Sequence, residues 1–266
     1  MSHWKIKLME ENQVSENEKD LSNKEVISSL KKKNWKSYFK EFFMLFLAIS
    51  LGFFVENQRE AYVENKSAKV LAQSMLEDLE QDKKALHEGI RFMEEKDQNM
   101  DKFLRMLHAP GADWDTVAFY KSMTMVFSTF PFSPTDGTYS QMKSSGTLRY
   151  FDQRLVNQMN AYDNQLKKTV FRDELVEKAE WELVPLAATL INFEVTGELR
   201  FNKPITKETY IKIRDEDTLD LFINKVVTVR TMMGRSLQEY KVLLLLNGDL
   251  IQELKDEYRL NYADNP

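Results

Sequence analysis

The feature that most constrains this chain is an apolar run over residues 38–55, with the sequence YFKEFFMLFLAISLGFFV. From residue 42 onward the run contains no charged residue and no proline. About 18 residues of α-helix cover roughly 27 Å, close to the hydrocarbon thickness of a bilayer. Lys40 can extend its stem to the headgroups, and Trp35 and Tyr38 favour the same interface. The run therefore predicts a membrane-spanning helix.

A buried core helix and a cleavable signal peptide are the two alternative interpretations of so short a run. A long polar leader precedes it, and it continues into Glu56, Asn57 and Gln58 without a small-residue cleavage pattern. A core helix normally carries a polar stripe, whereas only Ser50 and Gly52 interrupt the apolar residues from residue 42 onward. Both observations favour the span.

Lysines on one side of the run predict its orientation. Basic segments stay in the cytoplasm, so the N-terminus is expected inside and the rest of the chain outside the cytoplasmic (inner) membrane. The predicted parts are a disordered cytoplasmic tail over residues 1–37, an anchor over 38–55 and a periplasmic helical domain over 56–266. Anionic lipid is the expected partner of the basic end of the tail. The residues concerned are Lys31, Lys32, Lys33 and Lys36.

Composition limits which fold classes and which kinds of binding partner are possible. The net charge is -5 and the pI is about 5.5, which argues against nucleic acid as a partner. The absence of cysteine excludes disulfides, thiolate catalysis and zinc–thiolate sites. With 8 glycines and 6 prolines in 266 residues, the chain is expected to form an all-α fold.

A heptad stripe follows the anchor. No turn signal occurs before Pro110 and Gly111, so one helix is expected to continue from the anchor to residue 107. Lys83 and Asp97 interrupt the stripe, which either packs inside its own domain, the interpretation we favour, or forms a self-associating coiled coil. Its members are Leu76, Leu79, Leu86, Ile90, Met93, Met100, Leu104 and Leu107. The neighbouring acids Glu77, Asp78, Glu80 and Asp82 are expected on the solvated face.

Turn signals divide the next part of the chain. Asp113 or Asp115 is expected to cap a short helix over residues 116–127. The segment FPFSPTDG, residues 130–137, is predicted to be a loop because its prolines prevent helix. Residues 138–145 have room for two helical turns, with Gly146 as a left-handed C-terminal cap.

Two longer helices complete the prediction. One covers residues 152–182 and should be kinked or interrupted at Pro185. Residues 196–206 are expected to form a loop or a short pair of strands. Asp215 or Asp217 then caps a last long helix, with kinks allowed at Gly234 and Asn247-Gly248. The whole predicts an elongated antiparallel helical bundle that continues from the membrane helix.

Two segments resemble a known family. KSYFKEFFMLFLAISLGFFVENQRE carries Glu41, Gly52 and Asn57 at matching places, and TYSQMKSSGTLRYFDQRLVNQMNAYDNQL is similar to a Thr-Tyr, Leu-Lys-Ser-Ser-Gly and later tyrosine pattern. They resemble small single-pass membrane proteins, widespread in Bacteroidota and classified only as a domain of unknown function. The resemblance implies a membrane-anchored helical domain and no activity. The matching residues of the second segment are Thr138, Tyr139, Lys143, Ser144, Ser145, Gly146, Leu155 and Tyr162.

This second segment is also the candidate site. Ser140 and Lys143 fit S-x-x-K, in which the lysine could deprotonate a serine nucleophile, but the accompanying S-D-N and K-T-G elements are missing. The turn from residue 143 to 146 could alternatively bind a carboxylate or phosphate through backbone N–H groups. A conformational role is the favoured interpretation. The candidate ligand or conformational residues are Thr138, Tyr139, Lys143, Ser144, Ser145, Gly146 and Tyr162.

No metal or cofactor is expected. His3, His87 and His108 form no pair at metal-ligand spacing, and no phosphate-binding glycine motif occurs. The leading functional hypothesis is a non-enzymatic scaffold or accessory subunit that acts on a protein partner or as a homo-oligomer. The alternative is a ligand-sensing domain, in which a ligand near residues 130–146 shifts the anchor helix. An enzyme is the third hypothesis.

Overall fold

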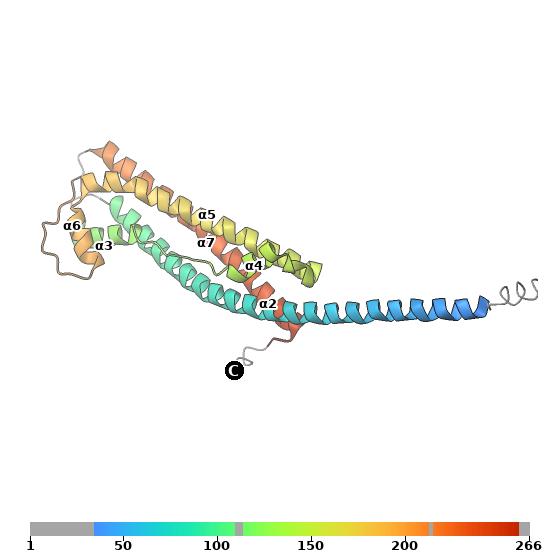
Figure 1. Cartoon of the computed structure of the whole chain (residues 1–266). Helices are drawn as coiled ribbons and strands as arrows, with labels where there is room; N and C mark the ends of the chain where they lie inside the picture. The colour runs from blue at the N-terminus through green and yellow to red at the C-terminus, as the bar shows by residue number, and fades with distance from the viewer. Residues whose placement is uncertain (1–34, 110–113, 213–214, 261–266) are drawn as a thin grey trace, which may run out of the picture. The chain divides into compact units, whose positions relative to one another are not determined.

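The computed structural model describes residues 35–109, 114–212 and 215–260. Residues 1–34, which include Lys31, Lys32 and Lys33, lie outside the described residues. So do Pro110 and Gly111, which were predicted to end the first helix, and Asp113, one of the two candidate caps of the next helix. The all-α prediction is confirmed, and within the described ranges the only strand-like pairing is an isolated antiparallel bridge between Ile191 and Ile211. The elements are α2 (Trp35–Leu107), α3 (Thr116–Val126), α4 (Gly137–Ser145), the 3-10 helix η2 (Thr147–Tyr150), α5 (Gln153–Leu190), α6 (Phe193–Arg200) and α7 (Glu216–Tyr258) (Figure 1).

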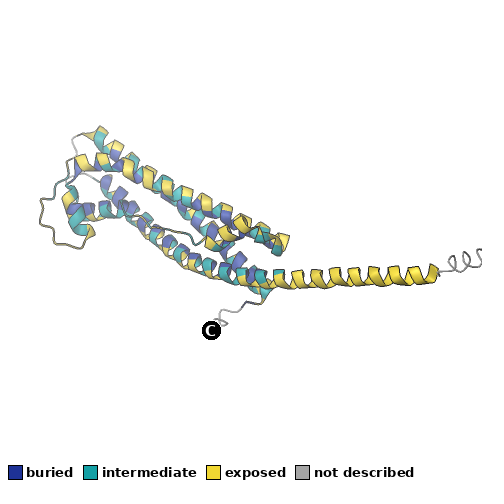
Figure 2. Ribbon diagram, in the orientation of Figure 1, coloured by how far each residue is buried: buried dark blue, intermediate teal, exposed yellow. Residues whose placement is uncertain are grey.

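The chain divides into two compact units, residues 1–63 and 64–266. In the first unit, every described residue is exposed (Figure 2). An 18-residue window of this part of α2 has a mean hydropathy of 1.7 and no buried residue, so the helix is long and apolar enough to cross a membrane. Stacked ring pairs, Phe39 with Phe43 and Phe42 with Phe46, cover its surface.

The second unit is a bundle of three long helices: the part of α2 from residue 64, α5 and α7. Interactions between them fix their directions. α7 runs antiparallel to α5, because Arg154 pairs with Glu253 while Glu182 pairs with Lys225. α7 is also antiparallel to α2, where Glu80 pairs with Lys255 and Glu94 with Lys241.

α2 and α5, in contrast, run parallel. Asp82 contacts Tyr162 and Lys96 contacts Glu180, so residue numbers increase in the same direction on both helices. A parallel pair requires a connection that returns along the bundle. Residues 128–136 provide this connection between α3 and α4, and we call them the return segment (Figure 1).

The heptad stripe lies in the core of this unit. Leu76, Leu79, Leu86, Met93, Met100, Leu104 and Leu107 are buried, and Ile90 packs against them. Removing each such side chain from water stabilises the fold by about 1.5–3 kcal/mol before entropy is counted. The stripe therefore packs inside its own domain, as the favoured interpretation expected. The inward faces of all three long helices are buried (Figure 2).

Several local predictions are confirmed. The Asp115 carboxylate caps α3 by accepting from the N–H groups of Val117 and Ala118. The Asp215 carboxylate caps α7 by accepting from Thr218 N. Gly146 ends α4 with φ at +71°, a conformation that glycine adopts without steric cost.

The predicted interruption of α5 at Pro185 was wrong. α5 continues through Pro185 to Leu190, because Leu183, Ala187 and Leu190 remain buried and hold the last turns against the core. α7 is also uninterrupted through Gly234 and residues 247–248.

Residues 196–200 are helical rather than loop or strand, so this expectation was wrong as well. The Asn192 side chain accepts from Glu194 N and begins α6, and Val195 is fully buried. Only residues 201–206 form the expected loop, and the isolated bridge at Ile211 lies beyond it.

Candidate functional site

The return segment lies along α2 and is bonded to it at both ends. Lys96 Nζ donates to Ser128 O at 2.7 Å, and Thr135 N donates to Asp82 Oδ1 at 2.7 Å. One turn further down α2, Asp78 Oδ2 accepts from Thr138 N at 3.1 Å. α2 side chains thus satisfy backbone groups of a segment that has no helical hydrogen bonds of its own.

Asp82 is the centre of a buried polar cluster. Its second carboxylate oxygen accepts from Tyr162 Oη at 2.7 Å, and Asn247 Nδ2 donates to Tyr162 Oη at 3.4 Å and to Leu79 O at 2.9 Å. The cluster connects α2, α5, α7 and the return segment.

The expectation that Asp82 lies on the solvated face was wrong, because its side chain is 1% exposed. Asp82 follows Leu79 by three residues and precedes Leu86 by four, which places it on the apolar stripe. Lys96 has the same spacing to Met93 and Met100. This spacing is the sequence signal that would have identified both buried charges.

Burial determines the protonation of the Asp82 cluster. Loss of solvation raises the pKa of Asp82, and the bonds from Thr135 and Tyr162 oppose the increase. Loss of solvation and the neighbouring Asp82 charge both raise the pKa of Tyr162 far above its usual range. Tyr162 therefore keeps its proton and remains the donor to Asp82.

A buried ion pair connects α2 to α5. Lys96 Nζ lies 2.5 Å from Glu180 Oε1, and the two side chains are 2% and 5% exposed. Burial lowers the pKa of Lys96 and raises that of Glu180, while their mutual attraction acts in the opposite sense on each. Breaking one partner of such a pair leaves an uncompensated buried charge.

A partly buried carboxylate, that of Asp173, connects α5 to α7. Asp173 accepts from Ser236 Oγ and, at 2.5 Å, from Tyr240 Oη. Burial raises the pKa of Asp173 against both bonds. The Tyr240 ring also packs on Phe132 of the return segment, with ring centroids 5.3 Å apart.

Two cavities adjoin the Lys96–Glu180 pair. The larger, about 610 Å³, is lined by α3, α5 and α6, with Phe127, Trp181 and Phe193 among its walls. The smaller, about 310 Å³, is lined by α2, the return segment, α5 and α7. Thr129, Glu177 and Glu180 line both cavities. Sequence reasoning did not identify this site, because its walls come from segments far apart in the chain.

The structure brings some of the predicted site residues together. Tyr139 and Tyr162 line one small cavity with Asp163, and Lys143 Nζ lies 3.3 Å from Asp163 and 5.3 Å from the Tyr139 ring centroid. Tyr139 Oη donates to Asn160 at 2.7 Å. These residues form a contact between α4 and α5.

The other predicted site residues lie apart from the cavities. Ser144 and Ser145 are exposed, and their hydroxyls donate to Gln141 O, while Gly146 is the cap of α4. Ser140 Oγ contacts Asp136 at 3.5 Å rather than Lys143, so the S-x-x-K residues form no nucleophile–base pair among the described contacts.

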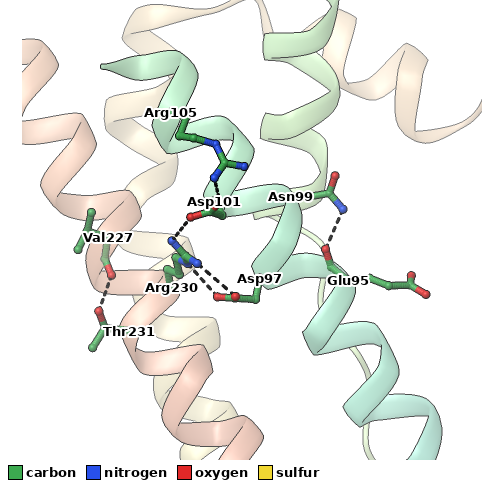
Figure 3. A network of polar contacts seen from close by, with 8 residues as sticks. All are labelled: Glu95, Asp97, Asn99, Asp101, Arg105, Val227, Arg230 and Thr231. Carbon is green, nitrogen blue, oxygen red and sulfur yellow. Dashed lines mark hydrogen bonds and ion pairs between the residues drawn. The ribbon is translucent and has the colours of Figure 1, made fainter. Parts of the chain in front are cut away.

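The interruption of the heptad at Asp97 has a structural cause. Asp97 accepts from Arg230 Nε at 2.8 Å and from Nη2 at 3.2 Å, and Asp101 accepts from Arg230 Nη1 at 3.0 Å (Figure 3). Arg105 pairs with Asp101 on the same face of α2 (Figure 3). The guanidinium of Arg230 on α7 thus binds Asp97, which stands where the stripe would have an apolar residue.

Comparison of the chain with protein-family models, curated proteins and solved structures gives no match. The described residues also contain no group of three His, Cys, Asp or Glu side chains placed to hold a metal ion. The resemblance to the Bacteroidota family therefore stays a prediction. Any functional assignment depends on the site itself.

Proposed function

We propose that this chain is a non-enzymatic, single-pass protein of the cytoplasmic membrane that acts as a scaffold or accessory subunit through its periplasmic helical domain. The observation that carries the proposal is the exposed apolar surface of α2 over residues 42–55. Phe42, Met44 and Phe53 are 65%, 73% and 73% exposed. So much apolar surface is stable in lipid and unfavourable in water.

The buried polar chemistry of the domain supports action through contacts. Asp82, the Lys96–Glu180 pair and Asp173 each connect one long helix to another. These groups hold the bundle in a defined arrangement, which a protein that presents a fixed surface to a partner requires. The partner is a second protein or a second copy of this chain.

The anchor is tested by extraction of membranes with alkaline carbonate. The full-length protein should remain with the lipid, and Leu45→Arg with Ile49→Arg should release it, since each charge near the centre of a span costs about 2.5–3.5 kcal/mol. Tyr62→Arg is the matched control beyond the apolar run. Release of the unsubstituted protein would refute the anchor.

Orientation is tested with alkaline phosphatase fused to the C-terminus, which is active only outside the cytoplasm. We expect an active fusion, because Lys36 and Lys40 precede the apolar run and Glu56 and Glu60 follow it. An inactive fusion would reverse the proposed topology.

Action through contacts is tested by affinity purification of the full-length protein in mild detergent, followed by mass spectrometry and sizing. We expect a stoichiometric partner or a homo-oligomer that survives washing. A monomer without a partner would overturn the proposal.

A further inference from the structure

The two cavities beside the Lys96–Glu180 pair are both lined by aromatic rings and carboxylates. Each has four aromatic rings on its walls: Phe127, Trp181, Phe193 and Phe201 line the larger cavity, and Phe92, Phe130, Phe132 and Tyr240 line the smaller. Trp181 is 67% exposed and Phe201 72% exposed although each lines a cavity. Both side chains are therefore accessible from solvent.

Carboxylates outnumber cations on these walls. Glu177 and Glu180 line both cavities, and Asp173 and Glu174 line the smaller. Lys96 is already bonded to Glu180 and to Ser128 O. Arg200, on the wall of the larger cavity, is exposed to solvent.

Glu180 provides a buried carboxylate that lines both cavities. It is 4% exposed, and the hydrogen bonds of the described residues involve Oε1 alone. Its second oxygen remains free to accept from a ligand. Glu177, at the exposed end, accepts from Trp181 Nε1 at 3.4 Å, which places a carboxylate beside the indole ring. A cation on the face of the Trp181 ring would be attracted both by the ring and by the carboxylate at the ring edge.

We propose that the two adjoining cavities bind an organic cation, an amine or quaternary ammonium with an apolar or aromatic body. The cationic group lies on the face of the Trp181 ring, near the Glu177 carboxylate at the ring edge and near Glu180, and the body fills the Phe127 and Phe193 side of the larger cavity. A volume of about 610 Å³ suits a small molecule of this kind. This binding function is additional to the proposed scaffold role and does not depend on the anchor.

The test uses the full-length protein in non-ionic detergent and benzyltrimethylammonium chloride as probe, at constant ionic strength. We expect saturable binding by titration calorimetry and a concentration-dependent rise in Tm, because the probe binds the native state. Phenylacetate, which has a similar body and the opposite charge, should bind at least tenfold more weakly. Equal or tighter binding of phenylacetate would overturn the proposal, as would no binding of the cation.

Variants locate the site. Trp181→Ala and Glu177→Gln should each weaken the cation about tenfold, which corresponds to one cation–π or charge contact. Both residues are exposed, so the variants should fold, and circular dichroism checks this. Phe171→Ala is the aromatic control on the same helix outside both cavities, and Glu95→Gln is the carboxylate control on α2. If all four variants bound the cation equally, the assignment to this site would be wrong.

Discussion

Tyr162 on α5 donates a 2.7 Å hydrogen bond to Asp82 on α2, and the same carboxylate receives the N–H of Thr135 from the return segment. One buried charge thus fixes three parts of the chain that are far apart in sequence. Asp82 holds both the return segment and α5 against α2. Because the return segment runs back along α2 before α5 begins, α5 is parallel to α2.

Tyr162→Phe should destabilise the domain by about 1–3 kcal/mol. The substitution keeps the ring and removes the hydroxyl, which leaves an Asp82 oxygen and the Asn247 amide with one partner fewer in a buried site. Urea unfolding of the full-length protein in detergent measures the change. Tyr62→Phe, at a tyrosine that is 70% exposed, is the control and should change stability by less than about 0.5 kcal/mol. Equal stability of the two variants would contradict the role of Tyr162.

Asp82→Asn should change the pH dependence of stability. Burial raises the pKa of Asp82 above its ordinary 3.8, so between that value and its folded pKa the folded state binds more protons than the unfolded state. The contribution of this carboxyl to stability is thus present at low pH and lost as pH rises through the folded pKa.

The measurement is unfolding of the two proteins across the acidic range. The unsubstituted protein should lose stability relative to Asp82→Asn as pH rises. Asp173 and Glu180, whose pKa values burial also raises, are common to both proteins and cancel in the difference. Parallel pH profiles would contradict the prediction.

Gly89→Ala should destabilise the bundle by about 1–3 kcal/mol. A Cβ at this buried position would lie 2.6 Å from Tyr240 Cε1 and 3.0 Å from the Phe130 ring. Tyr240 cannot move easily because its hydroxyl bonds Asp173. Gly234→Ala is the matched control, since nothing lies within 4 Å of its added Cβ. That variant should be stabilised by up to about 1 kcal/mol, and melting curves followed at 222 nm distinguish the two signs.

The Asp97–Arg230 fork should show measurable coupling. A double-mutant cycle with Asp97→Asn and Arg230→Gln is expected to give an interaction of about 0.5–1 kcal/mol, because the pair is bidentate and only partly exposed. The single 3.4 Å contact of Lys225 with Glu182 is the comparison cycle and should give a smaller value. A larger coupling for Lys225 would show that the fork geometry is unimportant.

Features that depend on neighbours in the sequence were predictable. The apolar run, the caps at Asp115 and Asp215 and the left-handed Gly146 each depend on side-chain chemistry within a few residues. The apolar period likewise identified the buried face of α2, since the hydrophobic effect has no direction and acts on whatever stripe is present.

Features that depend on partners distant in the sequence were not predictable. Asp82 and Lys96 are charged residues on the buried face of α2, and only the position of Tyr162 and Glu180 on α5 makes their burial stable. The continuation of α5 through Pro185 similarly depends on packing that local propensity does not include.

The sequence by itself determined that this is a helical chain with one membrane-length apolar segment, because periodicity, caps and composition are local properties. Only the tertiary structure decided that α2 and α5 are parallel, that the return segment lies along α2, and that aromatic rings and carboxylates line the same two cavities. Those arrangements depend on which buried charges find partners across the bundle, and a buried charge is stable only when a specific distant group satisfies it.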